Sequence, residues 1–273
     1  MKTDGHYQLE GDAPELYERY LVPAVTSRWA ADLLARAHPR PGETVLDLAC
    51  GTGVVARQAA KLMGRGSVIG ADVNAGMLRV ARAVAADMQI AWLEASALSL
   101  PFSQDSFDLV LCQLGLQFFP SQGLALVEMH RVLSPAGRIA LSVFSRIERT
   151  PGANAFVLAL DRVLGPHASG MKRGEHLFQH PDQLRTLLQN AGFLSVEVTT
   201  VSQEISFPSV LDYVRFQLMA TPMARLLADR SDCEPIISEI AMETKCLSTA
   251  LIRQDGSFSF PQEAFAATGR KSA

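Results

Sequence analysis

The sequence predicts a doubly wound α/β fold, in which helices cover both faces of a mostly parallel sheet. Two observations support this prediction. Between residues 43 and 144, apolar segments with the composition of strands alternate with segments of helical composition. The first strand and helix are joined by the glycine turn Gly51-Thr52-Gly53. The length of 273 residues is long for one minimal domain and short for two, so we expect one domain with an insertion.

The expected strands of this core are short and almost entirely apolar, which is typical of parallel strands that are buried on both faces. They lie at residues 43–49, 67–72, 90–94, 107–113 and 137–144. The helices expected between them lie at residues 53–63, 75–87 and 121–133. In open sheets of this kind, ligands bind beyond the carboxyl ends of the strands.

The segments on either side of this core are predicted to be largely helical. Residues 13–37 repeat apolar side chains at helical spacing, and we expect Pro23 to break or kink that helix. The later elements are expected to be helices at 153–164 and 181–191, a loop at 167–174, strands at 194–201 and 257–267, and an entirely helical stretch at 208–252. We therefore expect five segments: N-terminal helices that cover the ligand site (1–42), a ligand-binding core (43–145), the rest of the α/β core (146–205), a helical lid insertion (206–252), and a last strand and tail (253–273).

Charge and cysteine content argue against several kinds of partner. The net charge of −3 gives no general attraction for nucleic acid or for an anionic membrane surface. No apolar run approaches the roughly 18–20 residues that a membrane-spanning helix needs, and the N-terminal segment lacks the apolar core of a secretory signal. The four cysteines show neither metal-site nor Cys-x-x-Cys spacing, so we expect a reduced, cytoplasmic setting.

The glycine turn predicts a nucleotide-like cofactor. A strand, a tight glycine turn and a helix N-terminus together cradle such ligands, because glycine lets the backbone approach them closely. Asp72 ends the second strand 21 residues after Gly51, where an acid can accept hydrogen bonds from ribose hydroxyls. Both features are shared by NAD-dependent enzymes and by enzymes that use S-adenosyl-L-methionine (SAM).

Asp47 distinguishes these two classes. It lies inside the first strand, four residues before Gly51, where a carboxylate suits a cationic ligand better than a pyrophosphate. SAM carries both a sulfonium and an ammonium group. An NADP-dependent reductase is the alternative, but the sequence lacks the Tyr-x-x-x-Lys pair of short-chain reductases, and Asp72 would repel a 2′-phosphate.

Five ordered motifs resemble those of a known family: VLDLACGTG, GADVNAGML, LSLPF, FDLVLC and HRVLSPAGRIALSVF. They resemble class I SAM-dependent methyltransferases. Within these, the chain is similar to the group that includes the ubiquinone/menaquinone C-methyltransferases and many natural-product methyltransferases. The resemblance is strong over residues 43–145 and looser over 181–201 and 255–268. It implies a Rossmann-like sheet of seven strands whose last strand, near 257–267, is antiparallel.

The resemblance also implies which residues bind SAM and its product, S-adenosyl-L-homocysteine (SAH). Gly51 and Gly53 would pass beside the methionine end, Asp47 would orient the turn, and Asp72 would hold the ribose diol. Ser96 stands where this family often has Asp, and it would accept a hydrogen bond from the adenine amine. The residues expected to contact the cofactor are Tyr20, Asp47, Ala49, Gly51, Gly53, Asp72, Val73, Met77, Ser96, Ala97 and Gln113.

The expected reaction is direct displacement of the SAM methyl group by a carbon or oxygen atom of a small, largely apolar acceptor. The sulfonium is a good leaving group, so the protein mainly aligns the reacting atoms and excludes water. The sequence shows no obligatory general base. Tyr20, His176 and His180 are the candidates for an acid or base near the acceptor. The candidates for contact with the acceptor are Phe118, Phe207, Tyr213, Phe216 and Met219.

Other functions and partners remain possible at this point. His176 and His180 have the i, i+4 spacing of zinc ligands but not the His-Glu-x-x-His order, so we expect no metal. The same fold could serve a protein that binds SAM without catalysing a transfer. We expect a small-molecule acceptor and no nucleic-acid partner, and a helical lid could exchange between the subunits of a homodimer.

Overall fold

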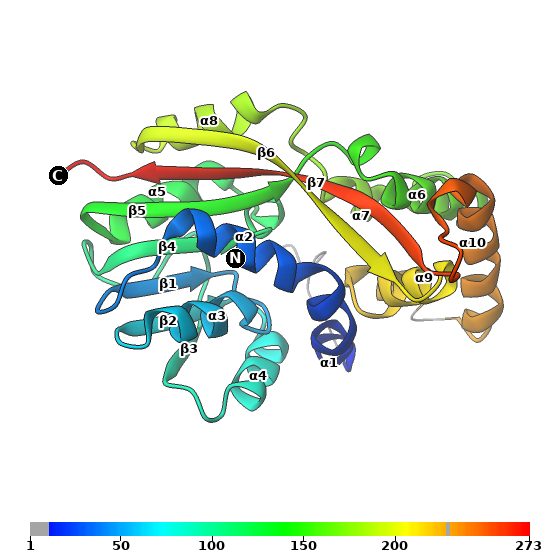
Figure 1. Ribbon diagram of the computed structural model, residues 1–273, viewed down its shortest axis with the longest axis horizontal. Coiled ribbons are helices and arrows are strands. Elements are labelled where there is room, and N and C mark those ends of the chain that lie inside the picture. Colours follow the sequence, from blue (N-terminus) through cyan, green and yellow to red (C-terminus); the bar gives the residue numbers. More distant parts are fainter. Residues whose placement is uncertain (1–10, 228–229) are drawn as a thin grey trace.

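One seven-stranded sheet organises the protein. The computed structural model describes residues 11–227 and 230–273. The strands are β1 (Thr44–Leu48), β2 (Ser67–Asp72), β3 (Ile90–Glu94), β4 (Phe107–Gln113), β5 (Leu133–Phe144), β6 (Leu194–Phe207) and β7 (Phe258–Arg270). They lie in the order β3-β2-β1-β4-β5-β7-β6, and β7 is antiparallel to both neighbours while every other pairing is parallel (Figure 1). The predicted seven-stranded sheet with an antiparallel last strand is confirmed.

Helices flank this sheet on both faces (Figure 1). The α-helices are α1 (Ala13–Leu16), α2 (Ser27–Ala37), α3 (Val54–Met63), α4 (Ala75–Val84), α5 (Gln122–Val132), α6 (Pro151–Leu164), α7 (Gly170–Gly174), α8 (Pro181–Asn190), α9 (Val210–Met219) and α10 (Cys233–Leu247). A π-helical segment, η2 (Tyr17–Thr26), and four 3₁₀ turns complete the described elements: η3 (Leu116–Phe118), η4 (Ile147–Arg149), η5 (Pro222–Leu226) and η6 (Thr249–Leu251). None of the described helices is long and apolar enough to cross a membrane.

Side-chain alternation along β4 explains why the central strands are apolar throughout. Leu109 and Leu111 belong to a buried cluster with residues of α2 and α3, on one face of the sheet. Val110 and Cys112 belong to a second cluster, with residues of α5 and α8, on the other face. Both faces of the strand are therefore core, and the sequence shows a continuous apolar run.

The last two strands extend beyond the rest of the sheet. Pairing of β6 with β7 continues as far as Phe207 opposite Phe258, and α6, α9 and α10 gather around this extension (Figure 1). We call these three helices and the outer parts of the strands (201–207 and 258–264) the lid. Its core is a cluster of buried aromatic and aliphatic side chains. The expectation that β6 ends at 201 was wrong, because polar residues 202–204, largely exposed on this edge strand, conceal its continuation.

Two further expectations about segments near the lid were wrong. Residues 208–252 are not entirely helical, because α9 ends before Thr221, whose hydroxyl caps the separate turn η5 by accepting from the Met223 amide at 3.2 Å. Residues 167–174 were expected to be a loop but include α7. The carboxylate of Asp161 anchors the start of that helix by accepting from both the amide and the hydroxyl of Ser169, at 3.0 and 2.8 Å.

Pro23 does not break the N-terminal helix. It lies on the exposed side of η2, and helical structure continues from Ala13 through Ala37. Proline cannot donate the backbone hydrogen bond that a regular α-helix requires, and π-helical turns occur where that regular pattern is interrupted. The wider turns of η2 therefore accommodate a residue that would interrupt a regular α-helix.

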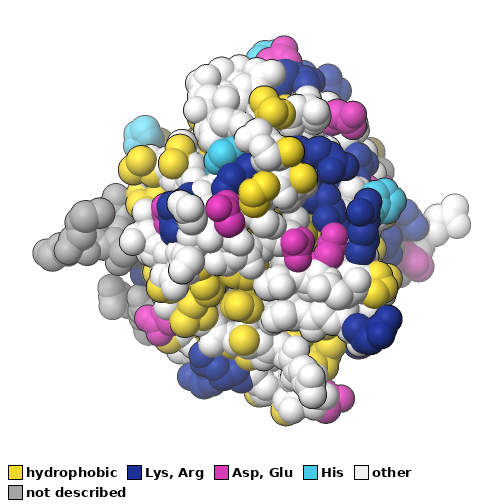
Figure 2. Space-filling model, turned by 90° about the vertical axis from the view of Figure 1, so that its left-hand side faces the viewer, with side chains coloured by type: hydrophobic (Ala, Val, Ile, Leu, Met, Phe, Trp, Pro, Cys, Tyr) yellow, Lys and Arg dark blue, Asp and Glu magenta, His cyan; other side chains and the backbone are white. Residues whose placement is uncertain are grey.

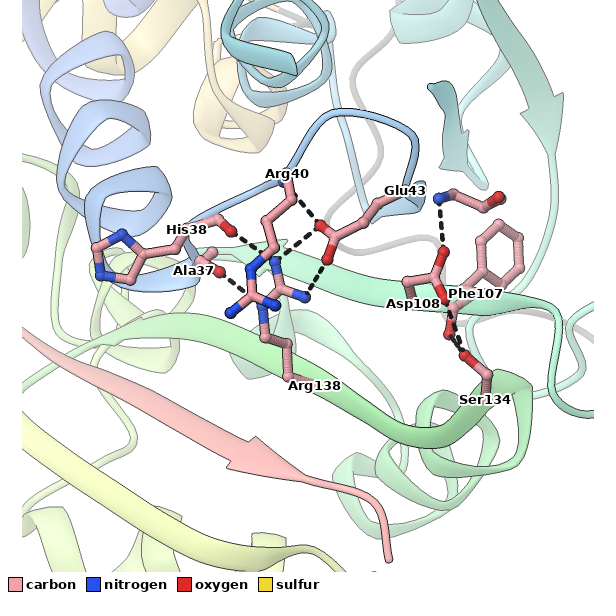
Figure 3. A network of polar contacts seen from close by, with 9 residues as sticks. Ala37, His38, Arg40, Glu43, Phe107, Asp108, Ser134 and Arg138 are labelled. Carbon is pink, nitrogen blue, oxygen red and sulfur yellow. Dashed lines mark hydrogen bonds and ion pairs between the residues drawn. The ribbon is translucent and has the colours of Figure 1, made fainter. Parts of the chain in front are cut away.

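At the amino ends of the strands, Arg138 joins three separate segments (Figure 3). Its guanidinium donates to both carboxylate oxygens of Glu43, at 2.7 and 2.8 Å, and to the carbonyl oxygens of Ala37 and His38, each at 2.7 Å. Burial alone would raise the pKa of Glu43, but hydrogen bonds from Arg138 and from the Arg40 amide lower it below its ordinary value. The network fixes the connection between α2 and β1 against β5.

The same face of the molecule carries basic side chains with acidic ones among them (Figure 2). A hollow of about 210 Å³ there is lined in part by Arg36, Arg40, Arg138 and Arg270. Arg36 pairs with Asp32 and Arg138 pairs with Glu43, each at 2.7 Å, so much of this positive charge is neutralised locally.

The indole of Trp92, on β3, fills the space beside the turn that follows β1. A Cβ atom at Gly53 would lie 2.2 Å from this ring, and one at Gly70 would lie 2.4 Å from it. Real Cβ contacts are never this short, so both positions require glycine while the indole is in place. This packing holds the turn between β1 and α3 against the sheet.

We expect Arg138→Met to lower the free energy of unfolding by about 2–4 kcal/mol, because it leaves the mostly buried Glu43 carboxylate without its charged partner. The pKa of Glu43 is lower in the folded protein than its ordinary value of 4.5. The ion pair therefore stabilises the folded state fully above pH 4.5, and this stabilisation is lost as the pH falls through the lower folded-state pKa. Denaturant titrations should show the gap in stability between wild type and variant narrowing as the pH is lowered below 4.5. As a control, Arg253→Met removes a half-exposed ion pair and should change stability by less than about 0.5 kcal/mol. A gap independent of pH would contradict this account of Glu43.

Gly53→Ala should destabilise the protein by about 2–4 kcal/mol, since the new methyl group meets Trp92 and the residue has φ +82°. Gly51→Ala is the matched control. Its φ of +54° carries the conformational cost of about 1–2 kcal/mol, but its Cβ meets nothing within 4 Å. Chemical denaturation of the two variants compares them directly, and equal losses of stability would contradict the packing argument.

Candidate active site

The carboxyl ends of adjacent strands bring three of the predicted residues to one edge of the sheet. Asp47 lies in β1, Asp72 ends β2 and Gln113 ends β4. The three strands are parallel neighbours, so these positions share the edge from which the lid projects (Figure 1). A ligand bound here would lie between the core and the lid.

The turn after β1 leaves open space at only one of its two predicted glycines. Ala49, Gly51 and Gly53 have φ values of 56°, 54° and 82°. A Cβ on Gly51 would meet nothing within 4 Å, whereas Gly53 is closed off by Trp92. Gly51 therefore offers accessible backbone to a ligand, while Gly53 is explained by packing. Ala49 holds a left-handed conformation that costs about 1–2 kcal/mol, and such strain is often found at functional turns.

Asp72 ties this turn to the start of α4. One carboxylate oxygen accepts from the Gly51 amide at 2.8 Å, and the other accepts from the Asn74 amide at 2.9 Å. Burial raises the pKa of Asp72, although these amide bonds act in the opposite direction. Each oxygen keeps a lone pair, so the carboxylate can also accept from ligand hydroxyls.

Asp47 is the more deeply buried acid, with 1% of its surface exposed. It accepts from the Ala56 amide at 2.9 Å, in the first turn of α3. Burial raises its pKa to about 8, the Ala56 bond opposes this, and the nearby charge of Asp72 adds to it. Burial therefore disfavours the charged form of this carboxyl group, and a nearby cation would favour it.

The N-terminal segment lies over these acids, and it contributes residues that the sequence analysis missed. Glu18 pairs with Arg57 of α3 at 2.8 Å, and Arg57 also donates to the carbonyl oxygen of Thr52 in the turn. Burial, with smaller effects from Asp72 and Glu18, raises the pKa of the Tyr17 hydroxyl. Tyr17 is three residues before the predicted Tyr20, but helical periodicity alone could not tell which tyrosine faces the site.

The predicted aromatic residues divide between the lid core and its boundary with the N-terminal segment. Tyr20 stacks on Phe216 of α9, with ring centroids 4.3 Å apart. Phe207 and Tyr213 are buried in the lid core, where the Tyr213 ring packs against Phe207 and other aromatic rings. Met219 is 39% exposed at the end of α9. Burial in the lid core is a sufficient physical reason for the apolar character of Phe207 and Tyr213.

The two predicted histidines lie in different environments. His176 is buried, and its Nδ1 lies 2.6 Å from the carbonyl oxygen of Ser145, just after β5. His180 is exposed at the start of α8, where its amide donates to Gln183. The two rings therefore form no pair. Within residues 11–227 and 230–273, no group of three or more His, Cys, Asp or Glu is placed to hold a metal ion.

Four more of the residues predicted to contact the cofactor, Val73, Met77, Ser96 and Ala97, lie on the β2 and β3 side of the turn. Val73 is exposed, whereas Met77 is buried against Ala13 and Tyr17. Ser96 is half-buried and accepts from the Leu98 amide at 3.2 Å. Next to it, Ala97 is buried, and Phe118 is half-buried in η3 near the opposite end of the site.

Several buried polar atoms near this edge have no hydrogen-bond partner among the described residues. Burying a polar atom without a partner is costly, and such atoms are rare in native structures. They are Glu18 Oε2, Thr26 Oγ1, Thr52 Oγ1, Gln113 Oε1, both amide atoms of Gln117, His176 Nε2 and Gln217 Oε1. They come from the N-terminal segment, the glycine turn, the end of β4, η3, the segment after α7 and α9.

Comparisons with known proteins identify the family of this chain. Residues 24–206 match the model of the ubiE/COQ5 methyltransferase family. The ubiquinone/menaquinone biosynthesis C-methyltransferase UbiE of Burkholderia vietnamiensis is 35% identical over 214 residues, which make up 74% of this chain and 88% of that protein.

Two solved structures share the fold. Phosphoethanolamine N-methyltransferase 2 of Haemonchus contortus, in complex with SAM, has a TM-score of 0.62 at 18% identity, covering 95% of this chain and 57% of that chain. The [4+2]-cyclase SpnF has a TM-score of 0.56 at 18% identity, covering 90% of this chain and 81% of that chain. At these identities the likeness is one of fold.

The described residues fit SAM on their own geometry. Gly51 offers open backbone, Asp72 offers acceptor lone pairs for hydroxyl groups, and Asp47 is a buried acid that a cation would ionise. The unpartnered oxygen atoms of Glu18 and Thr52 adjoin the same turn. From the family match and this geometry together, we conclude that the chain belongs to the ubiE/COQ5 methyltransferase family and uses SAM as its methyl donor.

Proposed function

We propose that this enzyme methylates a carbon or oxygen atom of a small, largely apolar acceptor that binds between the sheet edge and the lid. The observation that carries this proposal is the set of unpartnered polar atoms at the carboxyl edge, beside a lid rich in aromatic side chains. A ligand with an apolar body and a few polar groups would satisfy both. The C-methyltransferase activity named for the Burkholderia relative supports carbon as one possible methylated atom.

The proposed roles of the segments follow the order of the chain. Residues 13–37 cover the cofactor, and the stacking of Tyr20 on Phe216 closes this cover against the lid. The lid, which includes most of residues 206–252, excludes water from the acceptor. A bound SAM supplies an activated methyl group, so the main task left to these residues is to align the acceptor atom with it.

Three side chains were candidates for an acid or base near the acceptor, and their surroundings favour one of them. His180 is exposed at the start of α8, and Tyr20 is engaged with Phe216. His176 is buried, oriented by Ser145, and has a free ring nitrogen. The proposal therefore assigns contact with the acceptor to His176. A carbon acceptor that is already activated, or an ionised phenolate, would need no base.

The test of the proposed function uses SAM with a trideuterated methyl group. The protein is incubated with this SAM and with a fraction of small apolar metabolites, and the products are examined by mass spectrometry. We expect a product that carries one intact trideuteromethyl group, and fragmentation then tells carbon from oxygen methylation. SAH binding without any labelled product, across fractions that span small apolar compounds, would instead favour a protein that binds SAM without catalysing transfer.

The role of Asp72 can be tested by calorimetric titration with SAH. Asp72→Asn should weaken binding by at least about tenfold, because the neutral amide loses charge-assisted hydrogen bonds to the ribose diol. Asp108→Asn is the matched control, since Asp108 lies at the other end of β4, where it accepts from the Thr44 amide at 2.8 Å. It should leave the affinity within about twofold. Equal losses in both variants would remove Asp72 from the binding site.

A further inference from the structure

The amide of Gln117 is an exception to the usual pairing of buried polar groups. Gln117 lies in η3, directly after β4, and is only 3% exposed, yet neither its oxygen nor its nitrogen has a partner among the described residues. The chain offers a direct comparison in Gln262 of β7, which is 6% exposed and accepts from the indole N–H of Trp29 at 2.7 Å. One buried glutamine thus serves the fold, while the other has no visible structural role.

His176 presents a second unpartnered group, and its chemistry can be deduced from its neighbour. The carbonyl oxygen of Ser145 can only accept, so Nδ1 must carry the hydrogen and donate to it at 2.6 Å. In a neutral ring, Nε2 then has a free lone pair and can only accept. Burial, together with the charge of Lys172, lowers the pKa of His176 to about 3, so the ring stays neutral at physiological pH.

The orientation of this ring is fixed on two sides. It stacks on Phe144, with centroids 5.2 Å apart, and it is bonded to Ser145, the next residue in the chain. Phe144 ends β5, and η3, which carries Gln117, packs against that strand. His176 and Gln117 are therefore held near the ends of the neighbouring strands β4 and β5, on the side from which the lid projects.

The charged groups of this region are already neutralised. Lys172 is buried and pairs with Glu175 at 2.6 Å, so its charge is compensated. Among the other unpartnered atoms of the lid and the N-terminal segment, Gln217 Oε1 and Thr26 Oγ1 are uncharged. Glu18 Oε2 and Arg215 Nε are also unpartnered, but their side chains carry compensated charges, because each is paired at 2.8 Å, with Arg57 and Glu234 respectively. A ligand that satisfies these groups needs hydrogen-bond donors and no net charge.

We propose that Nε2 of His176 accepts a hydrogen bond from a hydroxyl group of the methyl acceptor, and that the Gln117 amide binds a second polar group of the same molecule. This inference rests on the proposed function and narrows it, because the acceptor is then an uncharged, hydroxyl-bearing compound. It also explains why two costly unpartnered groups are kept in the interior.

The first test measures thermal stability in the absence of any acceptor. Gln117→Leu replaces an unpartnered amide with an apolar group of similar size, so the melting temperature should stay equal or rise by about 3 °C. Gln262→Leu is the control, and it should lower the melting temperature because it leaves the Trp29 indole N–H without a partner. A fall for Gln117→Leu as large as that for Gln262→Leu would show a structural amide and overturn the assignment.

The second test uses phenol and toluene as probes, since these rings differ only in a hydroxyl or methyl group. They are titrated into the wild type, with and without SAH, and binding is followed by ¹⁵N NMR of the histidine rings. Phenol should bind at least about tenfold more tightly than toluene and shift the His176 Nε2 resonance. His176→Asn keeps an N–H for Ser145 but removes the Nε2 position, so the preference should fall to about twofold or less.

The outcomes of these titrations separate the two proposals. Equal binding of phenol and toluene, binding of neither, or a preference unchanged in His176→Asn would overturn the assignment of His176 even if labelled methyl transfer succeeds. Failure of methyl transfer with a normal phenol preference would overturn the proposed function and leave the hydroxyl site in place.

Discussion

The site depends on two buried carboxylates that hold the glycine turn at the carboxyl edge of the sheet. Asp72 binds the amides of Gly51 and Asn74, and Asp47 binds the amide of Ala56. These bonds join the ends of β1 and β2 to the starts of α3 and α4. Both acids lie where burial disfavours their charge, and their raised pKa values record that cost. We propose that a cationic cofactor offsets this cost, because its positive charge favours the ionised acids and its ribose hydroxyls can donate hydrogen bonds to Asp72.

The proposed acceptor site involves a different part of the molecule. The lid and the N-terminal segment share one aromatic core, so the surfaces that enclose an acceptor are built by segments far apart in the chain. The fold itself is shared with proteins named as an N-methyltransferase and as a [4+2]-cyclase. The fold therefore does not determine the acceptor, and we propose that side chains such as His176 and Gln117 contribute to its choice.

The sequence predicted the parts of the structure that depend on local patterns. Continuous apolar runs identified the central strands. The spacing from Gly51 to Asp72 correctly placed the glycine turn and the end of β2 at the same edge of the sheet. Gly53 was also found, but its physical reason is Trp92, a contact between β3 and the turn that no local pattern encodes. The full length of β6 was missed because its exposed residues are polar.

The polar interior of the site could not be predicted in the same way. Gln117 and Tyr17 have no signature in the sequence, since their burial depends on how η3 and η2 pack against distant strands and helices. His176 was a candidate only by residue type. Its tautomer and its free nitrogen follow from a contact with Ser145, 31 residues earlier in the chain.

The central claim is that a buried acid at this edge is kept for a cationic cofactor, and proton release on SAM binding tests it most directly. Calorimetric titrations at pH 7, in buffers with different ionisation enthalpies, give the number of protons released. The account predicts release of a substantial fraction of one proton by the wild type and much less by Asp47→Asn, whose side chain can still accept from Ala56. Equal proton release in the two proteins, or none in the wild type, would contradict it.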